Sequence, residues 1–190
     1  MDSANSSFDW AEDLLPVLRT EGIRHVTTVP DGGLASLLKK CEEASDINVT
    51  TLTSEEEGIA FACGAWLGGE KAVLFMQSSG VGNCINMLAL PSVCRMPCLM
   101  LVAMRGEEGE FNPWQVPMAR GVPDVFAAMG VTTYRPATAM EIGQKFASAA
   151  GLVYETGTTA AVLISQHIVG VKVFDAVSYT HLTLPTILLV

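Results

Sequence analysis

The sequence is short of charged residues, and of positive charge in particular. Only 16% of its 190 residues are charged, against about 25% in an ordinary soluble domain. The 11 lysines and arginines are scattered and are outnumbered by 20 acidic residues, so the net charge is −9. Nucleic-acid binding is therefore not expected, because phosphate contacts need clustered basic side chains. So small a charged share predicts instead that a partner covers part of the surface.

A long hydrophobic run is also missing. The longest, 96-MPCLMLVAM-104, has the length of a buried strand and falls short of the roughly 18–20 residues that cross a membrane. The first ten residues, MDSANSSFDW, show neither the basic region nor the apolar region of a secretory signal. We therefore expect no membrane segment and a cytoplasmic location.

Metal-binding and hydrolase patterns are absent from the sequence as well. The five cysteines are an odd number in apolar settings, and the spacing of Cys94 and Cys98 differs from that of a zinc knuckle. The three histidines lie neither near those cysteines nor beside a nucleophile, and there is no G-x-S-x-G elbow. We expect reduced cysteines in the core, a structural His25, and no metal bound by this chain.

The last residues differ in composition from the rest of the chain. After Phe174 comes 176-AVSYTHLTLPTILLV-190, which resembles the translated adaptor tails found at the ends of assembled gene fragments. The alternative is an extra edge strand followed by a disordered end. We expect residues 1–174 to form the domain and residues 175–190 to be a non-native or disordered tail.

Six β-rich runs alternate with helical stretches along the chain. Strands are expected at 25–29, 47–52, 72–76, 98–103, 131–135 and 160–165, and helices at 8–20, 33–44, 55–68, 82–94, 121–129 and 138–155. Several of the strands are continuous apolar runs, which is typical of strands buried on both faces of a parallel sheet. The pattern predicts a doubly wound α/β domain with a mainly parallel six-stranded sheet and helices on both faces. Ligands of such sheets bind at the carboxyl ends of the strands.

Two of the expected strand-end loops are rich in glycine. In 29-VPDGGL-34, Asp31 is either a functional carboxylate or only a turn residue or helix N-cap. In 77-QSSGVGNCIN-86, Gly80 and Gly82 are followed by a helical stretch. A dinucleotide loop would need a third glycine where Ile85 stands, so the second loop indicates only a ligand or a close neighbour.

Three glutamates begin the third expected helix, in 54-SEEEGIAFACGAWLGG-69. Ser54 and Glu57 match a capping box, and all three carboxylates lie where the helix dipole favours negative charge. The glycines and alanines that follow make the helix thin enough for another element to approach closely. A carboxylate at the start of this helix could therefore lie in a dry interface.

The longest polar segment, 104-MRGEEGEFNPWQVPMARG-121, follows the fourth strand. A loop of this length is more often functional than accidental, although a solvated surface lobe is the alternative. Phe111 and Trp114 could pack against a partner. Gln115, Arg105 and Arg120 could meet a polar ligand.

Taken in order, these segments resemble the pyrimidine-binding (PYR) domain of thiamine-diphosphate enzymes. The resemblance rests on VPDGGL, SEEEGIAFACGAWLGG, MQSSGVGN, MPCLMLVAMRG and FNPWQVPM, and it covers residues 8 to 174. It is strongest to the sulfopyruvate and phosphonopyruvate decarboxylase branch, particularly the separate α subunit of sulfopyruvate decarboxylase.

The resemblance implies a role for the first glutamate. The family carries an essential Glu nine residues before a helix glycine, and counting back from Gly64 gives Glu55, with Glu56 as the alternative. That carboxyl group hydrogen-bonds a pyrimidine nitrogen of thiamine diphosphate and favours the imino tautomer that removes the thiazolium proton. Asp31 corresponds to an active-site Asp. The cofactor-lining loop corresponds to Ser79, Gly80, Gly82 and Asn83.

The implied reaction is decarboxylation of a small 2-oxo acid that carries a 3-sulfo or 3-phosphono group. Arg105, Gln115 and Arg120 are the expected substrate residues. The family's diphosphate half, a G-D-G signature followed by Asn-Asn that binds Mg2+, has no counterpart in the sequence. We therefore expect Mg2+ and the diphosphate to be bound by a partner subunit, or by a missing C-terminal domain, in a homo- or hetero-oligomer.

Three other interpretations stay open at this stage. The same half-site would suit an acetolactate-synthase-like carboligase. The chain could instead be a non-catalytic α/β binding or regulatory module that kept only the fold. A nucleotide-binding domain that uses Gly80 and Gly82 is the third.

Overall fold

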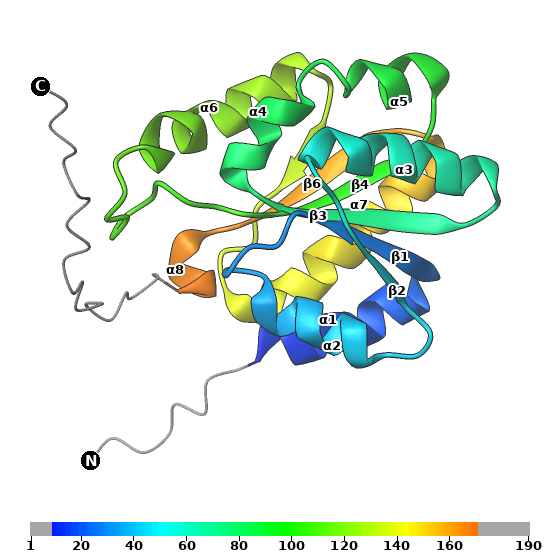
Figure 1. Ribbon diagram of the computed structural model, residues 1–190, viewed down its shortest axis with the longest axis horizontal. Coiled ribbons are helices and arrows are strands. Elements are labelled where there is room, and N and C mark those ends of the chain that lie inside the picture. The colour runs from blue at the N-terminus through cyan, green and yellow to red at the C-terminus, as the bar shows by residue number, and fades with distance from the viewer. Residues whose placement is uncertain (1–8, 171–190) are drawn as a thin grey trace, which may run out of the picture.

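A six-stranded parallel sheet forms the centre of the protein in a computed structural model, which describes residues 9–170 (Figure 1). The strand order is β2-β1-β3-β4-β6-β5, and every neighbouring pair is parallel. This confirms the predicted doubly wound α/β class. The strands are β1 (Ile23–Thr28), β2 (Asn48–Thr51), β3 (Lys71–Gln77), β4 (Cys98–Ala103), β5 (Thr132–Tyr134) and β6 (Thr159–Ile164).

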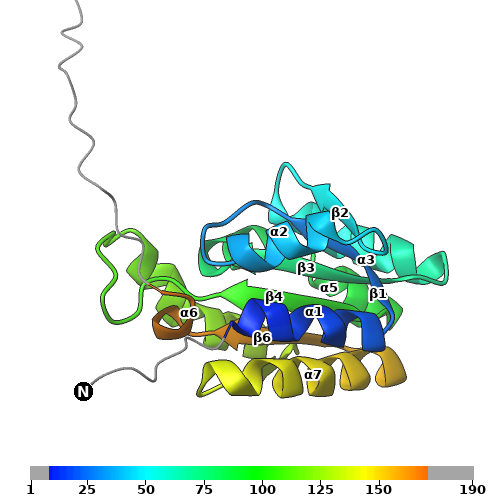
Figure 2. The ribbon, with the colours of Figure 1, turned by 90° about the horizontal axis from the view of Figure 1, so that it is seen from below.

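Helices cover both faces of the sheet. One face is covered by α1, α2 and α7, and the other by α3, α4, α5 and α6 (Figures 1 and 2). The helices are α1 (Trp10–Thr20), α2 (Ala35–Glu43), α3 (Glu55–Leu67), α4 (Val81–Cys84), α5 (Ala89–Cys94), α6 (Gln115–Ala128), α7 (Ile142–Thr156) and α8 (Gln166–Val169). Short 3-10 turns lie at Ser78–Gly80 and Ala139–Glu141.

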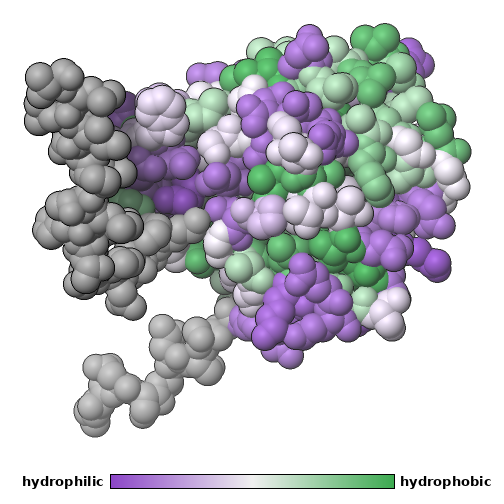
Figure 3. Space-filling model, in the orientation of Figure 1, coloured by the Kyte–Doolittle hydropathy of each residue, from purple (hydrophilic) through white to green (hydrophobic). Residues whose placement is uncertain are grey.

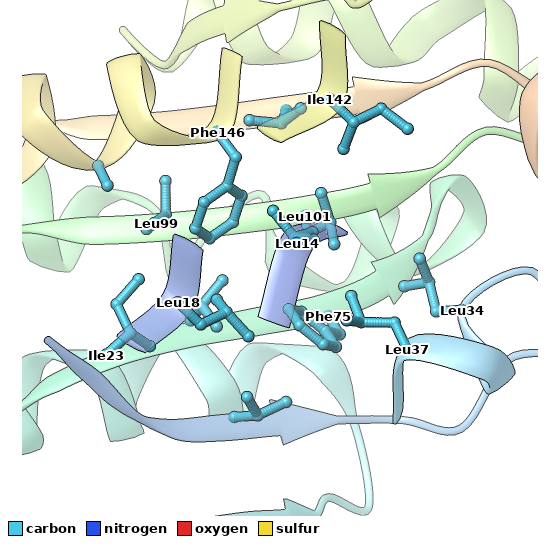
Figure 4. Packing of buried hydrophobic residues seen from close by; sticks show 14 of the residues in the cluster. Leu14, Leu18, Ile23, Leu34, Leu37, Phe75, Leu99, Leu101, Ile142 and Phe146 are labelled. Carbon is cyan, nitrogen blue, oxygen red and sulfur yellow. The ribbon is translucent and has the colours of Figure 1, made fainter. Parts of the chain in front are cut away.

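The hydrophobic core is divided by the sheet into two clusters. Along β3, Val73 and Phe75 face the α1–α2–α7 side, whereas Leu74 and Met76 face the α3–α6 side, as the alternation of a strand requires. On the first side, Phe146 of α7 packs toward the sheet among leucines from α1 and β4 (Figure 4). Burial on both faces explains why the central strands are continuous apolar runs.

Two expectations about the elements were wrong. The predicted helix at 82–94 is two short helices, α4 and α5, separated by a turn. The predicted loop 104–121 ends at Trp114, because α6 begins at Gln115 and includes Pro117 and Pro123. Pro117 is the third residue of α6 and costs no hydrogen bond, since the amide groups of the first turn have no partner inside the helix.

Part of the hydrophobic surface is left uncovered by this chain. Leu67, at the end of α3, and Val93, in α5, are 73% and 81% exposed, and hydrophobic side chains gather over this part of the surface (Figure 3). Apart from its chain neighbours and the nearby backbone of its own helix, nothing in the described part of the chain lies within 4 Å of where a Cβ of Gly64 would be. Within residues 9–170, no helix is long and apolar enough to cross a bilayer.

Candidate functional site

The carboxyl ends of the central strands lie together at one edge of the sheet, the left side of Figures 1 and 2. The register pairs Thr28 of β1 with Thr51 of β2, and Gln77 of β3 with Ala103 of β4. The segments that follow β1, β2, β3 and β4 therefore begin side by side. These are the segments in which the sequence placed its candidate residues.

Glu55, Gly80 and Asn83 form a direct contact at this edge. Glu55 is the first residue of α3 and is only 7% exposed. Its Oε2 accepts a hydrogen bond of 2.7 Å from Asn83 Nδ2. A Cβ on Gly80 would lie 2.5 Å from Glu55 Oε1, so glycine leaves the space that the carboxylate occupies.

The other two glutamates of the run lie outside this contact. Glu56 is half-buried and accepts a hydrogen bond from the Ser54 hydroxyl, which holds the pKa of Glu56 below its usual value. Glu57 is exposed, and its Oε2 accepts from the Thr53 amide at 3.0 Å. The predicted capping box of Ser54 and Glu57 is therefore wrong, because each side chain has a different partner. Of the three, Glu55 is the buried one.

The remaining residues of the β3–α4 loop extend the same surface. Ser79 is half-buried in the 3-10 turn that precedes α4. Gly82 lies near Met118 of α6, whose sulfur would be 3.5 Å from a Cβ at Gly82. Burial, together with the nearby charges of Glu55 and Glu56, raises the pKa of the Cys84 thiol to about 12, so this cysteine is neutral at ordinary pH.

Asp31 lies in the segment that follows β1. Its Oδ1 accepts a hydrogen bond of 2.8 Å from the amide of Gly33, which makes a local turn. The N-cap position of α2 is Leu34, so Asp31 is not a helix cap. Since β1 and β2 end side by side, Asp31 and Glu55 both extend from the same edge of the sheet.

Arg105 is held by a buried ion pair. Its Nε and Nη2 donate to the two carboxylate oxygens of Glu110 at 2.8 and 2.9 Å, and the two side chains are 7% and 1% exposed. Glu110 also accepts from the amides of Gly106 and Asn112 and from Gln166 Nε2. The bidentate bond from Arg105 holds the pKa of Glu110 down to about 2.

A second ion pair extends this network to the neighbouring strand ends. Glu107 is paired with Arg135, which follows β5. The backbone amide of Glu107 donates to Gln166 Oε1, and Glu107 Oε2 accepts from the backbone amide of Gln166. The segment after β4 is thereby fastened to α8. The Arg105 amide also donates to Ser78 Oγ at 3.0 Å, which links the network to the loop that faces Glu55.

The other predicted substrate residues lie on α6. Gln115 is its first residue, and its side-chain oxygen is buried without a hydrogen-bond partner among the described residues. Arg120 is exposed one and a half turns further along. Phe111 and Trp114 are exposed, Trp114 by 84%, and Trp114 lines a cavity of about 710 Å³ with Pro113, Pro117 and Met118.

Sequence reasoning missed three polar residues of this edge. Glu110 and Gln166 form the network with Arg105, and Gln77 ends β3 with a buried side-chain oxygen that no described residue meets with a hydrogen bond. Glu110 stood among several loop carboxylates, and nothing in the sequence marked it as buried. Only Gln77 could have been found from the sequence, because it is a polar residue at the end of an apolar strand.

Metal-ligating side chains do not gather at this edge. Within residues 9–170, no group of three or more His, Cys, Asp or Glu side chains could hold a metal ion. The polar groups that do gather are the buried carboxyl groups of Glu55 and Glu110, several amides and two paired arginines. Such a set suits an organic ligand with hydrogen-bonding atoms.

The chain matches a family model described as the thiamine pyrophosphate enzyme, N-terminal TPP binding domain, over residues 8–115. The α subunit of sulfopyruvate decarboxylase from Methanocaldococcus jannaschii is 33% identical over 147 residues, which cover 77% of this chain and 87% of the relative. Phosphonopyruvate decarboxylase from Streptomyces viridochromogenes is 36% identical over 101 residues, which cover 53% of this chain and 25% of the relative.

A solved structure supports the fold. The 2-oxoglutarate:ferredoxin oxidoreductase from Magnetococcus marinus aligns with a TM-score of 0.65 and 16% identity. The alignment covers 82% of this chain and 28% of that one, so the chain spans little more than a quarter of the larger protein. At this identity the likeness concerns the fold alone.

Proposed function

Because the chain belongs to the thiamine pyrophosphate enzyme family, in which it matches the N-terminal TPP-binding domain, we propose that it is the pyrimidine-binding half of a thiamine-diphosphate-dependent 2-oxo acid decarboxylase. The proposed substrates are 2-oxo acids with a 3-sulfo or 3-phosphono group. The names of its relatives support this substrate class, and they favour decarboxylation over carboligation. The observation that carries the proposal is the buried carboxyl group of Glu55 beside Gly80 and Asn83.

The residues at this edge fit the pyrimidine part of the cofactor. The Glu55 carboxyl group is almost fully buried and is fixed through Oε2 by Asn83, and the missing side chain of Gly80 leaves room for the carboxyl group itself. A buried carboxyl group is costly unless hydrogen-bonding groups meet its oxygens, and Asn83 donates to Oε2. Glu55, Gly80 and Asn83 would hold the aminopyrimidine ring, with Ser79 and Gly82 lining the same loop.

Glu55 acts on a proton in this proposal. When bound, thiamine diphosphate would supply a carbon nucleophile for the 2-oxo group and an electron sink for the loss of carbon dioxide. The carboxyl group of Glu55 would hold a proton for a ring nitrogen of the pyrimidine, and Asn83 keeps that carboxyl group in one orientation through its hydrogen bond to Oε2. Exclusion of water strengthens the hydrogen bond, since the effective dielectric constant is low in a buried site.

The substrate residues of the proposal come from the neighbouring loops. Asp31 extends from the end of β1 toward the same edge and is proposed to contact the reacting groups. Gln115 is proposed to bind the substrate, because it is the first residue of α6, directly after the segment that follows β4. Arg120 is the accessible cation of the set. Arg105 is ion-paired with Glu110 and is therefore poorly placed to bind an anion directly. Its proposed contribution is to hold the segment after β4 in position.

The proposed partner is a diphosphate-binding subunit or domain. Hydrophobic side chains exposed on α3 and α5, including Leu67 and Val93, and the open space beside Gly64, give it a surface to cover. The α-subunit name of one relative supports a separate partner, whereas a relative of which the chain spans a quarter supports a fused one. Mg2+ and the diphosphate would be bound by that partner.

Glu55→Gln tests the proposed reaction. With a diphosphate-binding partner and the cofactor present, the rate of 3-sulfo-2-oxo acid decarboxylation should fall by roughly 10²–10⁴-fold, because glutamine cannot share the proton. The rate is measured from carbon dioxide release at saturating substrate.

Glu57→Gln is the matched control for this experiment. Glu57 lies in the same helical turn but is exposed, so its substitution should leave the rate within about twofold of wild type. A Glu55→Gln enzyme with wild-type turnover would contradict the proposal and would favour a non-catalytic module.

A further inference from the structure

The start of α6 carries an apolar cavity that the proposed function does not use. The cavity has a volume of about 710 Å³, and the described residues that line it are Pro113, Trp114, Pro117 and Met118. Ligand pockets in proteins have volumes of roughly 300–1,000 Å³. The cavity is therefore large enough to hold part of a small organic molecule.

This cavity adjoins the loop that meets Glu55. Met118 Sδ would lie 3.5 Å from a Cβ at Gly82, and a Cβ at Gly80, in the same loop, would collide with the Glu55 carboxyl group. The helix α6 also contacts the 3-10 turn Ser78–Gly80. A molecule that is held at Glu55 and Gly80 therefore has the cavity beside it.

The backbone of Trp114 is fixed on both sides. Its amide donates to Asn112 Oδ1 at 3.1 Å, and the Asn112 amide donates to the buried carboxylate of Glu110 at 3.0 Å. After Trp114, the carbonyl oxygen of Gln115 would lie 2.5 Å from a Cβ at Gly106, so the two ends of the segment are in direct contact. A ring held in this way has little conformational freedom to lose when a ligand packs on it.

The cavity favours an apolar ligand group over a charged one. None of the described lining residues is charged, and Arg105 of the same segment is ion-paired with Glu110. A sulfonate or phosphonate would lose hydration in the cavity without gaining an opposite charge. A phenyl or branched alkyl group would gain free energy in proportion to the apolar surface that it buries, and a phenyl ring could also stack on the indole of Trp114.

We infer that the site decarboxylates a second class of substrate, 2-oxo acids with an aromatic or branched alkyl side chain, and that this side chain packs on Trp114 and Met118. The inference rests on the proposed function, because it uses the same cofactor at Glu55. The bond between the carboxyl carbon and the 2-oxo carbon breaks, carbon dioxide leaves, and the 2-oxo carbon takes up one proton. The products are carbon dioxide and the aldehyde, and the reaction needs no oxidant or reductant.

The test compares the wild-type chain with Trp114→Ala, each with its diphosphate-binding partner and the cofactor. Carbon dioxide release is measured with 2-oxo-3-phenylpropanoate and with 3-sulfo-2-oxopropanoate, and kcat/KM is determined for each. Wild type should act on both substrates. In Trp114→Ala, kcat/KM for the phenyl substrate should fall roughly 10- to 100-fold relative to that for the sulfo substrate, because one wall of an apolar pocket is lost. Trp114→Phe keeps an aromatic ring and should retain most of the wild-type ratio.

Phe111→Ala is the matched control. Phe111 is an exposed aromatic residue of the same segment, and it is not among the described residues that line the cavity. Its substitution should leave the ratio of the two kcat/KM values within about twofold of wild type. Trp114 is 84% exposed, so the melting temperature of Trp114→Ala should stay close to that of wild type.

Two outcomes would overturn the inference and leave the proposed function standing. One is a wild-type complex that acts on the sulfo substrate but not on the phenyl substrate. The other is an equal fall of both kcat/KM values in Trp114→Ala, which would place Trp114 in the contact with the partner subunit.

Failure of the proposed function would look different. A wild-type complex that releases carbon dioxide from neither substrate would contradict the function, and the inference would fall with it. A complex that acts on the phenyl substrate alone would support the inference and exclude the 3-sulfo class from the proposed function.

Discussion

The contact between Gly80 and Glu55 depends on a single missing methyl group. In Gly80→Ala, the new Cβ would lie 2.5 Å from Glu55 Oε1 and 2.6 Å from its carboxyl carbon, a separation that requires the carboxyl group to move. The backbone of Gly80 has a φ of −66°, so alanine meets no conformational strain and the effect comes from the contact alone. Displacement of a catalytic group by about 1 Å lowers the rate by roughly a hundredfold.

Gly82→Ala is the control for this substitution in the same loop. The nearest atom to its new Cβ would be Met118 Sδ at 3.5 Å, an ordinary contact. We expect the turnover of the assembled enzyme to fall about a hundredfold in Gly80→Ala, and calorimetric titration should show weaker cofactor binding. Equal turnover in the two variants would mean that the position of Glu55 does not matter.

The segment between β4 and α6 is an element held by one buried carboxylate. Glu110 accepts from Arg105, two backbone amides and Gln166, and it thereby joins this segment to α8. Removal of one partner would leave the other charge buried and unpaired, which is costly. The segment carries Trp114 and leads into Gln115, so the ion pair fixes the position of both.

The pH dependence of stability should report this ion pair. The pKa of Glu110 is lowered from 4.5 to about 2 in the folded protein by the Arg105 bond. Because the folded pKa is the lower one, its stabilisation is complete above pH 4.5 and is lost as the pH falls toward 2. The loss amounts to about 3 kcal/mol in the free energy of unfolding.

Glu110→Gln removes this titration. Its free energy of unfolding, measured by denaturant titration at several pH values, should be lower than that of wild type at pH 7, and the difference should shrink toward pH 2. Glu108→Gln alters an exposed glutamate of the same segment and should follow the wild-type curve. A constant difference between Glu110→Gln and wild type at all pH values would argue against the buried pair.

At the scale of the whole molecule, the fold divides the five cysteines into two groups. Cys94 at the end of α5 is exposed, whereas the other four are buried. Burial raises the pKa of each buried thiol, to about 12 for Cys41 and Cys84. The thiolate is the reactive form, so the buried cysteines should be unreactive while the protein is folded.

Thiol titration of the isolated chain tests this division. With a disulfide reagent in native buffer, one thiol should react rapidly and four should react only after unfolding in guanidinium chloride. Cys94→Ser should abolish the rapid phase. More than one rapidly reacting thiol in the native wild-type chain would mean that the buried cysteines are more accessible to the reagent than the structure shows.

The general architecture could be predicted from the sequence because strand burial leaves a direct signal. Continuous apolar runs such as the one in β4 indicate a parallel sheet covered on both faces, and all six strands were found within two residues of their predicted bounds. Boundaries that depend on local hydrogen bonds were harder. The start of α6 was missed because Pro117 and Gly121 are signals for loops, whereas α6 begins at Gln115, directly after a turn in which Asn112 Oδ1 accepts from the Trp114 backbone amide.

The roles of single polar residues also depend partly on the sequence and partly on the tertiary structure. Position along the chain was enough to place Glu55, Asp31 and the Gly80 loop at strand ends, because the carboxyl ends of parallel strands share one edge. Only the tertiary structure decided which carboxylates are buried. Glu55 lies against Gly80, and Glu110 captures Arg105, contacts between residues 25 and five positions apart that depend on the packing of whole elements.

The sequence by itself therefore determined the alternation of strands and helices, and with it the edge at which chemistry can occur, since these depend on local patterns of apolar and small residues. The tertiary structure decided which side chains at that edge meet. It removed Arg105 from the set of free cations and, within residues 9–170, left the side-chain oxygen of Gln77 without a hydrogen-bond donor. These outcomes depend on distances between elements, which no local pattern records.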